Sequence, residues 1–266
     1  MSAYFNKATG FLKSKSDSLV SNNSYLGKTI KAVIAIIVVM FLVYLVKKIA
    51  KGYNDYKSSH VMLLNGTKDA TKRMVILQDP TKENSKTIIR SKNEEGGLEF
   101  SYIFWMYIDD MSYRYGKWKH VMHKGNEEGH PLRAPGVWIH PKDNKLRIFM
   151  NTYSKINEYV DVDNIPVRKW FNVAICIKQK IMDIYINGNV VTSKKLSNLP
   201  KQNYGDLFIN SFQGFSGQLS NMQYYDYYIS YSQIRSSMNF GPSMMPLKDM
   251  QQQMPPYLTP NWWTNN

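Results

Sequence analysis

Residues 109–119, DDMSYRYGKWK, hold the side chains best suited to binding chemistry. Three aromatic rings stand close to acidic and basic groups. Sugar recognition needs this mix, because flat rings stack on C–H faces while hydroxyls require directed hydrogen bonds. Protein interfaces favour the same residue types, and single rings can also simply cover the edge of a domain. The candidate ligand-binding residues are Asp109, Asp110, Tyr113, Arg114, Tyr115 and Trp118.

Four histidines, His120, His123, His130 and His140, raise the possibility of a metal centre. Their spacing lacks the closely set Cys and His ligands of a zinc site, so we expect separate surface or loop residues. The single cysteine, Cys176, lies in an apolar run and is predicted to be a small buried hydrophobe. One cysteine allows no intramolecular disulfide, which suits folding in a reducing compartment.

The longest uncharged apolar stretch is Ala32–Val46. At about 1.5 Å per residue, a helix over residues 30–50 spans about 31 Å, which matches a hydrocarbon core of roughly 30 Å. The run is apolar all round, which favours a membrane helix over a buried core helix. We therefore predict a single transmembrane helix at 30–50 in a lipid bilayer, flanked by Lys28, Lys31, Lys47, Lys48 and Lys51.

A cleaved signal peptide is the alternative for this stretch. The small residues Ala50 and Gly52 lie beyond Lys47 and Lys48, so a retained signal anchor is the better interpretation. Four lysines in the twenty residues on each side of the run give the positive-inside rule no direction. The membrane orientation therefore stays open.

The formal net charge is +14. The first 57 residues carry nine lysines and two aspartates, a cluster that suits anionic lipid headgroups. Elsewhere the basic residues are spread among acids and form no long basic block. We expect no nucleic-acid binding.

Beyond residue 60 the chain consists of short apolar runs separated by turn residues. This spacing, with no long helical pattern between the runs, predicts an all-β sandwich or barrel. The runs cover 73–77, 86–90, 100–108, 136–140, 145–150, 158–162, 170–177, 182–186, 207–209 and 218–225.

The segment 170–191 predicts a hairpin. Phe171, Val173, Ile175 and Ile177 share one face of a first strand, and Met182, Ile184 and Ile186 share one face of a second. Asn187-Gly188 then supplies two residues that tolerate positive φ, as a type I′ turn requires.

Three segments carry a family resemblance. Residues 98–108, 170–190 and 215–234 resemble, in this order, the early core strand, the central hairpin and the last core strand of laminin-G-like domains of the concanavalin A-like lectin/glucanase superfamily. The resemblance implies a jelly-roll sandwich of two antiparallel sheets. The sequence of residues 91–125 also resembles that of single-pass proteins of large double-stranded DNA viruses, and the chain's richness in Asn, Lys, Ile and Tyr fits this resemblance.

Glucanases of this superfamily place carboxylates two residues apart on one strand, where one acts as acid and one as nucleophile. The nearest match is Glu158, Asp161 and Asp163, in which the leading Glu is one position out of step. We expect a solvated strand face and no catalytic residue. The resemblance also implies weak Ca²⁺ candidates at a sandwich rim, Asp109, Asp110 and Asn126, although acids before a turn are commonly turn formers.

The predicted domain map is a polar tail at 1–29, a transmembrane helix at 30–50, a stalk at 51–60, the sandwich at 61–240 and a Pro/Gln/Trp tail at 241–266 that includes Trp262 and Trp263. The predicted function is membrane display of a lectin-like sandwich that binds a glycan or a protein. The predicted setting is a virion membrane or host endomembrane. The alternatives are a membrane-tethered glycoside hydrolase and a structural protein that packs against other virion proteins.

Overall fold

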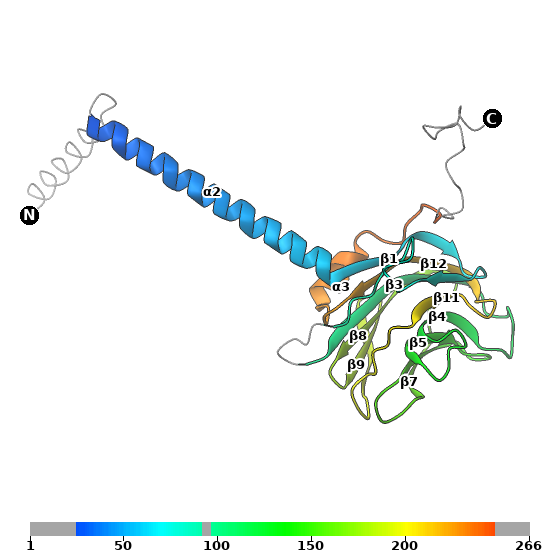
Figure 1. Cartoon of the computed structure of the whole chain (residues 1–266). Helices are drawn as coiled ribbons and strands as arrows, with labels where there is room; N and C mark the ends of the chain where they lie inside the picture. Colours follow the sequence, from blue (N-terminus) through cyan, green and yellow to red (C-terminus); the bar gives the residue numbers. More distant parts are fainter. Residues whose placement is uncertain (1–24, 92–96, 248–266) are drawn as a thin grey trace, which may run out of the picture. The chain divides into compact units, whose positions relative to one another are not determined.

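The computed structural model describes residues 25–91 and 97–247 and divides into two compact units, Met1–Ser58 and Ser59–Asn266 (Figure 1). The first unit contains helix α2 (Tyr25–Ser59). Its segment Lys28–Asn54 is long and apolar enough to cross a membrane by length and composition, properties that a signal sequence would share. The helix continues through residues 51–59, which we assigned to a stalk, because that polar segment contains no proline to end it.

The second unit is a sandwich of two antiparallel six-stranded sheets, as predicted (Figure 1). The first sheet has the order β1-β12-β3-β8-β9-β10, and the second has the order β2-β11-β4-β5-β6-β7. The strands are β1 (His60–Asp69), β2 (Met74–Ile76), β3 (Glu99–Asp110), β4 (Lys119–Gly125), β5 (Arg133–Ile139), β6 (Lys145–Met150), β7 (Glu158–Asp163), β8 (Trp170–Lys178), β9 (Ile181–Ile186), β10 (Asn189–Lys195), β11 (Asp206–Ile209) and β12 (Ser216–Tyr225).

Period-two alternation builds the core between the sheets. Val173 pairs with Ile186 and Ile175 with Ile184 across β8 and β9, and all four side chains are buried. Asn187 and Gly188, with φ of 50° and 76°, form the predicted turn between β9 and β10. Both angles are positive, as a type I′ turn requires. The hairpin prediction is therefore confirmed.

A short helix covers part of the outer face of the first sheet. Helix α3 (Tyr231–Met238) begins with a capping box, in which Ser230 accepts from the Gln233 backbone N–H and the Gln233 side chain accepts from the Ser230 N–H. Its Ile234 packs in a second apolar cluster with Cys176 of β8 and Tyr225 of β12. Burial there raises the pKa of the Cys176 thiol to about 12, so this cysteine is a structural residue.

The prediction of a strand at 86–90 is wrong. This segment runs beside the sandwich without joining a sheet, and side chains satisfy its backbone. Gln78 Nε2 donates to Lys86 O, Gln78 Oε1 accepts from the Ile88 N–H, and Lys86 Nζ donates to Leu63 O. Hydrogen-bonding groups from outside the sheets thus replace the ladder that a strand would need.

The described part of the C-terminal tail packs back on the sandwich. The Thr67 N–H of β1 donates to Met245 O, and the Leu247 N–H donates to Thr67 O. Trp262 and Trp263 lie outside the described residues.

Gly217 provides a test of the pairing between β12 and β3. A Cβ at this position, where φ is 152°, would lie 2.0 Å from Tyr107 O. Gly241 is a matched control, because its φ of 63° also disfavours a side chain but its Cβ would meet no atom within 4 Å. We expect Gly217→Ala to reduce the free energy of unfolding by at least about 2 kcal/mol more than Gly241→Ala in urea denaturation. Equal losses would contradict the pairing of Gly217 with β3.

Candidate functional site

The second sheet carries an aromatic surface on its outer side. Trp138, Phe149 and Phe208 each lie between two core residues of their strand, so period-two alternation turns their rings away from the core. Trp118 and Phe212 join them from neighbouring loops. We call this surface the aromatic face; its members are Trp118, His120, His123, Trp138, Phe149, Tyr159, Phe208 and Phe212.

Two histidines of β4 form the centre of this face, and our prediction of separate surface histidines is wrong for them. His120 and His123 are buried, and their Nε2 and Nδ1 atoms lie 2.7 Å apart. Residues three apart in a regular strand point to opposite faces. The pairing of β4 with β5 shifts register between His120 and Met122, and this irregularity turns both rings to the same side.

The neighbouring hydrogen bonds determine which histidine of this pair donates and which accepts. The Ser211 N–H donates to His120 Nδ1, so the proton of a neutral His120 lies on Nε2 and is donated to His123 Nδ1. His123 Nε2 then donates to Asn126 O at 2.8 Å. The pair therefore ties the loop that carries Phe212 to the loop that follows β4. Burial lowers the pKa of both histidines, for His120 well below its ordinary value.

Loop 126–132 is folded down onto the aromatic face. Asn126 Nδ2 donates to the Glu128 carboxylate and to His130 O, and its oxygen accepts from the Leu132 N–H. A Cβ on Gly129 would lie 3.4 Å from both the His123 and Trp138 rings, so the glycine allows this close approach.

Two arginines lie over the rings. The Arg133 guanidinium carbon is 3.6 Å from the ring centre of Phe149 and 5.1 Å from that of Trp138, and Arg147 is 3.9 Å from that of Tyr159. Arg147 also makes a bidentate pair with Asp161. Arg133 donates to Asn157, its buried Nε has no partner, and no carboxylate pairs with it within the described residues. Burial lowers the pKa of Arg133 to about 10.

A hollow of about 260 Å³ opens between these loops and rings. Its floor is the aromatic face and its rim supplies a carboxylate, an imidazole and a guanidinium. Chemically it offers stacking surfaces beside hydrogen-bonding groups, the mixture that fixes a small polar ring. The lining residues are Trp118, Glu128, Gly129, His130, Arg133, Trp138, Phe149 and Phe212.

Of the ligand-binding residues that we predicted in loop 109–119, some line the hollow and others do not. Trp118 lines the hollow, stacking edge-on against His140 at 5.1 Å. Tyr113 Oη donates to Gln213 O and Arg114 donates to Phe212 O, so these two side chains hold the neighbouring loop. Tyr115 is exposed and does not line the hollow.

The calcium candidates do not converge. Asp110 ends β3 and accepts from the Ser112 N–H and hydroxyl, Asp109 lies beside it, and Asn126 follows the far end of β4. At about 3.3 Å per residue, this seven-residue strand separates the two sets by roughly 20 Å. A Ca²⁺ site built from all three residues is therefore excluded by their placement.

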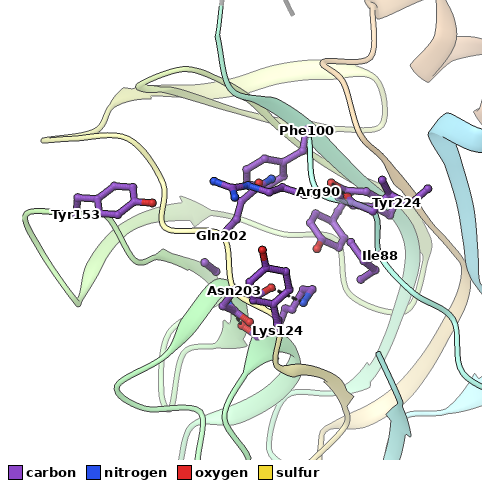
Figure 2. A pocket seen from close by; sticks show the side chains of 12 residues that line it. Ile88, Arg90, Phe100, Lys124, Tyr153, Gln202, Asn203 and Tyr224 are labelled. Carbon is purple, nitrogen blue, oxygen red and sulfur yellow. Dashed lines mark hydrogen bonds between the residues drawn. The ribbon is translucent and has the colours of Figure 1, made fainter. Parts of the chain in front are cut away.

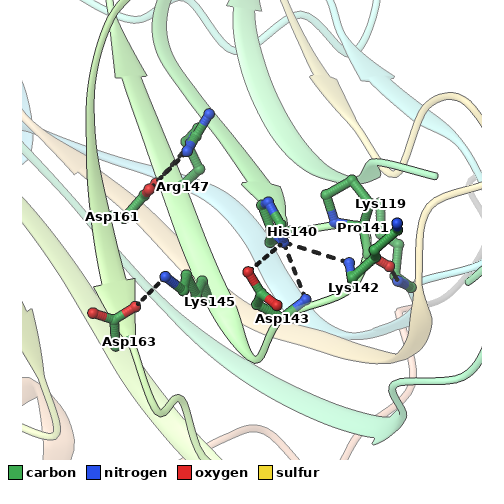
Figure 3. Close-up of polar contacts among 9 residues, drawn as sticks. All are labelled: Lys119, His140, Pro141, Lys142, Asp143, Lys145, Arg147, Asp161 and Asp163. Atoms are coloured by element: carbon green, nitrogen blue, oxygen red, sulfur yellow. Dashed lines mark hydrogen bonds and ion pairs between the residues drawn. The ribbon is translucent and has the colours of Figure 1, made fainter. Parts of the chain in front are cut away.

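The acidic side chains of β7 pair with other side chains of the sandwich, and Figure 3 shows the pairs of Asp161 and Asp163. Arg147 holds Asp161 at 2.6 Å, and Lys145 Nζ lies 3.2 Å from Asp163. Arg147 also lowers the pKa of Asp161 by hydrogen bonding. Glu158 is buried, and its carboxylate accepts from the Ser197 N–H and hydroxyl. All three carboxylates thus have structural partners.

Residues 82–235 match a family model described as the concanavalin A-like lectin/glucanases superfamily. This match covers more than half of the chain. The chain belongs to this superfamily. No curated protein matches it significantly.

Solved structures of similar fold include receptor-binding parts of bacterial neurotoxins. The receptor binding domain of botulinum neurotoxin D is 14% identical, with 68% of this chain and 52% of that chain covered and a TM-score of 0.49. The botulinum neurotoxin serotype G binding domain is 12% identical, with 68% and 50% covered and a TM-score of 0.47. A serotype D ligand binding domain in complex with N-acetylneuraminic acid is 13% identical, with 68% and 50% covered and a TM-score of 0.49.

The superfamily member described here spans about a third to a half of the length of the solved chains that it resembles. Identities and TM-scores this low carry no argument about this chain. The aromatic face must therefore be interpreted from its own residues. Sequence reasoning missed most of it, although one signal was present: in 137–139, 148–150 and 207–209 both alternating sets of side chains are apolar or aromatic.

The buried histidine pair predicts a loss of stability in mild acid. Below about pH 6.5 His120 becomes protonated in the unfolded chain, whereas its lowered pKa keeps it neutral in the folded chain. The unfolded state then binds more protons, so the free energy of unfolding decreases as the pH is lowered. His120→Asn keeps an acceptor for the Ser211 N–H and removes the titration. We expect urea denaturation between pH 7 and 5.5 to show a slope smaller by up to about 1.4 kcal/mol per pH unit in this variant. Identical slopes would contradict a buried neutral His120.

Proposed function

We propose that the protein is a single-pass membrane protein that displays a glycan-binding sandwich, with the aromatic face as its binding surface. One observation carries the proposal. Exposed aromatic rings, Trp118 at 37%, Tyr159 at 41% and Phe212 at 47% exposure, surround the rings of the sheet, and two of the three line a hollow beside polar groups. Helix α3 packs on the outer side of the first sheet, whereas no helix among the described residues of the sandwich unit packs on the aromatic face.

The chemistry of the hollow favours a sugar over a flat protein partner. A sugar ring presents C–H groups on its faces and hydroxyls around its edge. The exposed rings of Trp118 and Phe212 offer apolar surfaces, while Arg133 and Glu128 offer a donor and an acceptor at the rim. Protein contacts of ordinary size bury about 800 Å² on each partner and do not depend on one small hollow.

We propose further that the sandwich binds its glycan without hydrolysing it. Retaining glycosidases need two carboxyl groups about 5–5.5 Å apart, one of them protonated at working pH. Asp161 is instead held by Arg147, which lowers the pKa of its carboxyl group and favours the charged form, and Asp163 pairs with Lys145. The membrane-tethered hydrolase is the alternative that an assay of glycan turnover would detect.

The setting that we propose is a virion membrane or host endomembrane, with the lipid bilayer as one partner and other virion proteins as further partners. The viral part of the proposal rests on the resemblance of residues 91–125 to single-pass proteins of large DNA viruses. The membrane part rests on the apolar segment of α2, whose described side chains are mostly exposed.

Glycan binding is tested with the full chain in detergent on an array of immobilised glycans. Trp118→Ala and Phe212→Ala should each weaken binding to the best ligands at least about fivefold, because aromatic anchors carry much of a contact's energy. Phe240→Ala is the control, since Phe240 is 86% exposed and follows α3, away from the aromatic face. A blank array, or equal losses in all three variants, would rule out this site.

Membrane anchoring is tested by alkaline carbonate extraction of cell membranes. Replacing Val38 and Val39 with Asp should release the chain, because each aspartate at mid-helix costs about 2.5–3.5 kcal/mol of insertion. Val190→Asp with Val191→Asp is the matched control, since these two valines are exposed on β10 of the sandwich. Release of the unaltered chain by carbonate would remove the anchor from the proposal.

A further inference from the structure

A second cavity lies inside the sandwich unit, apart from the aromatic face (Figure 2). Its volume is about 230 Å³. Phe100 and Tyr102 of β3, Tyr224 of β12 and Lys124 of β4 contribute to its walls, so both sheets line it. None of its lining residues belongs to the aromatic face or its hollow.

Two irregular segments complete the walls, and hydrogen bonds hold both in place. Tyr224 Oη donates to Ile89 O at 2.8 Å, which fixes segment 88–90. Lys124 Nζ donates to Asn203 O and Gly205 O, each at 2.8 Å, and Asn203 Nδ2 donates back to Lys124 O. The walls of the cavity are therefore fixed without a ligand, and Lys124, which lines the cavity, holds one of the two segments in place.

The polar groups around this cavity are incompletely matched. The Gln202 side-chain oxygen is buried and has no hydrogen-bond partner within the described residues. Lys124 is buried and has three N–H donors, of which two reach carbonyl oxygens. Arg90 adds a second cation, and none of the described residues that line the cavity carries a carboxylate. An unmatched buried acceptor calls for a donor, and two cations call for an anion.

We propose that this cavity binds one hexuronic acid, that is, a single sugar ring that carries a carboxylate and several hydroxyls. The carboxylate pairs with Arg90 and the remaining N–H of Lys124, a hydroxyl donates to the Gln202 oxygen, and the ring packs against Phe100. The volume supports one ring, because pockets for larger ligands measure roughly 300–1,000 Å³. The site is independent of the aromatic face and adds a second, acid-selective binding site to the same sandwich.

The charge on Lys124 gives this binding a pH dependence. Burial lowers the pKa of Lys124 to about 8, and the nearby Asp206 raises it in part. The other ionisable groups around the cavity are Arg90, Tyr102, Tyr153, Tyr204 and Tyr224. An anion needs the protonated amine, so affinity should fall as pH rises from 7 to 9.

Calorimetric titration of the full chain in detergent with glucuronate tests the proposal, with glucose and inorganic sulfate as comparison probes. Glucuronate should bind at least about tenfold more tightly than either, a difference of about 1.4 kcal/mol. Gln202→Leu and Arg90→Gln should each weaken glucuronate binding at least about fivefold. Gln202→Leu should not lower the melting temperature, because it removes a buried unmatched oxygen.

Trp118→Ala is the control, because it alters the aromatic face alone. Loss of glucuronate binding in Trp118→Ala would assign the acid to the aromatic face and overturn the second site. Equal binding of sulfate would reduce the site to a simple anion contact, and equal binding of glucose would remove the role of the two cations. Absence of any glucuronate binding would overturn the proposal outright and leave glycan binding at the aromatic face as a separate question.

Discussion

The hydrogen bond between His120 and His123 is the contact on which the aromatic face depends. It joins two imidazoles that must both be neutral, since His120 Nδ1 accepts from the Ser211 N–H and His123 Nδ1 accepts from His120 Nε2. Through its hydrogen bonds to backbone groups at both ends the pair fixes two loops, one with Phe212 and one with the rim of the hollow. The His123 ring also stacks on Phe208 and Trp138, with centres 4.9 and 5.7 Å away. One buried pair thus positions rings from strands and loops that are distant in sequence.

Most of the sandwich could be predicted from the sequence because its signals are local. Alternation over 170–186 identifies one core face, and Asn187-Gly188 identifies the turn that follows. The aromatic face could not be predicted in the same way. Trp138 and Phe149 each lie between two apolar residues, so 137–139 and 148–150 carry no alternation that separates core from surface. The position of Trp118 depends on how its loop meets β5 and β6, which spacing alone does not determine.

The histidine pair shows the limit most clearly. A separation of three residues in a regular strand predicts rings on opposite faces. Only the irregular register at His120 and Met122 brings them together, and it depends on pairing with a strand elsewhere in the chain. The same reasoning explains Asn126. It was grouped with Asp109 and Asp110 because all three flank one region of sequence, yet the length of β4 keeps them at opposite ends.

The proposed glycan-binding surface is the aromatic face of the sandwich. The location of the glycan is tested most directly by ¹⁹F NMR of the full chain labelled with 5-fluorotryptophan. Trp118 and Trp138 lie on the aromatic face, while Trp105 and Trp170 lie in β3 and β8 of the other sheet. Addition of the best array glycan should shift the resonances of Trp118 and Trp138 and leave those of Trp105 and Trp170 unchanged. Shifts confined to Trp105 or Trp170 would contradict the account.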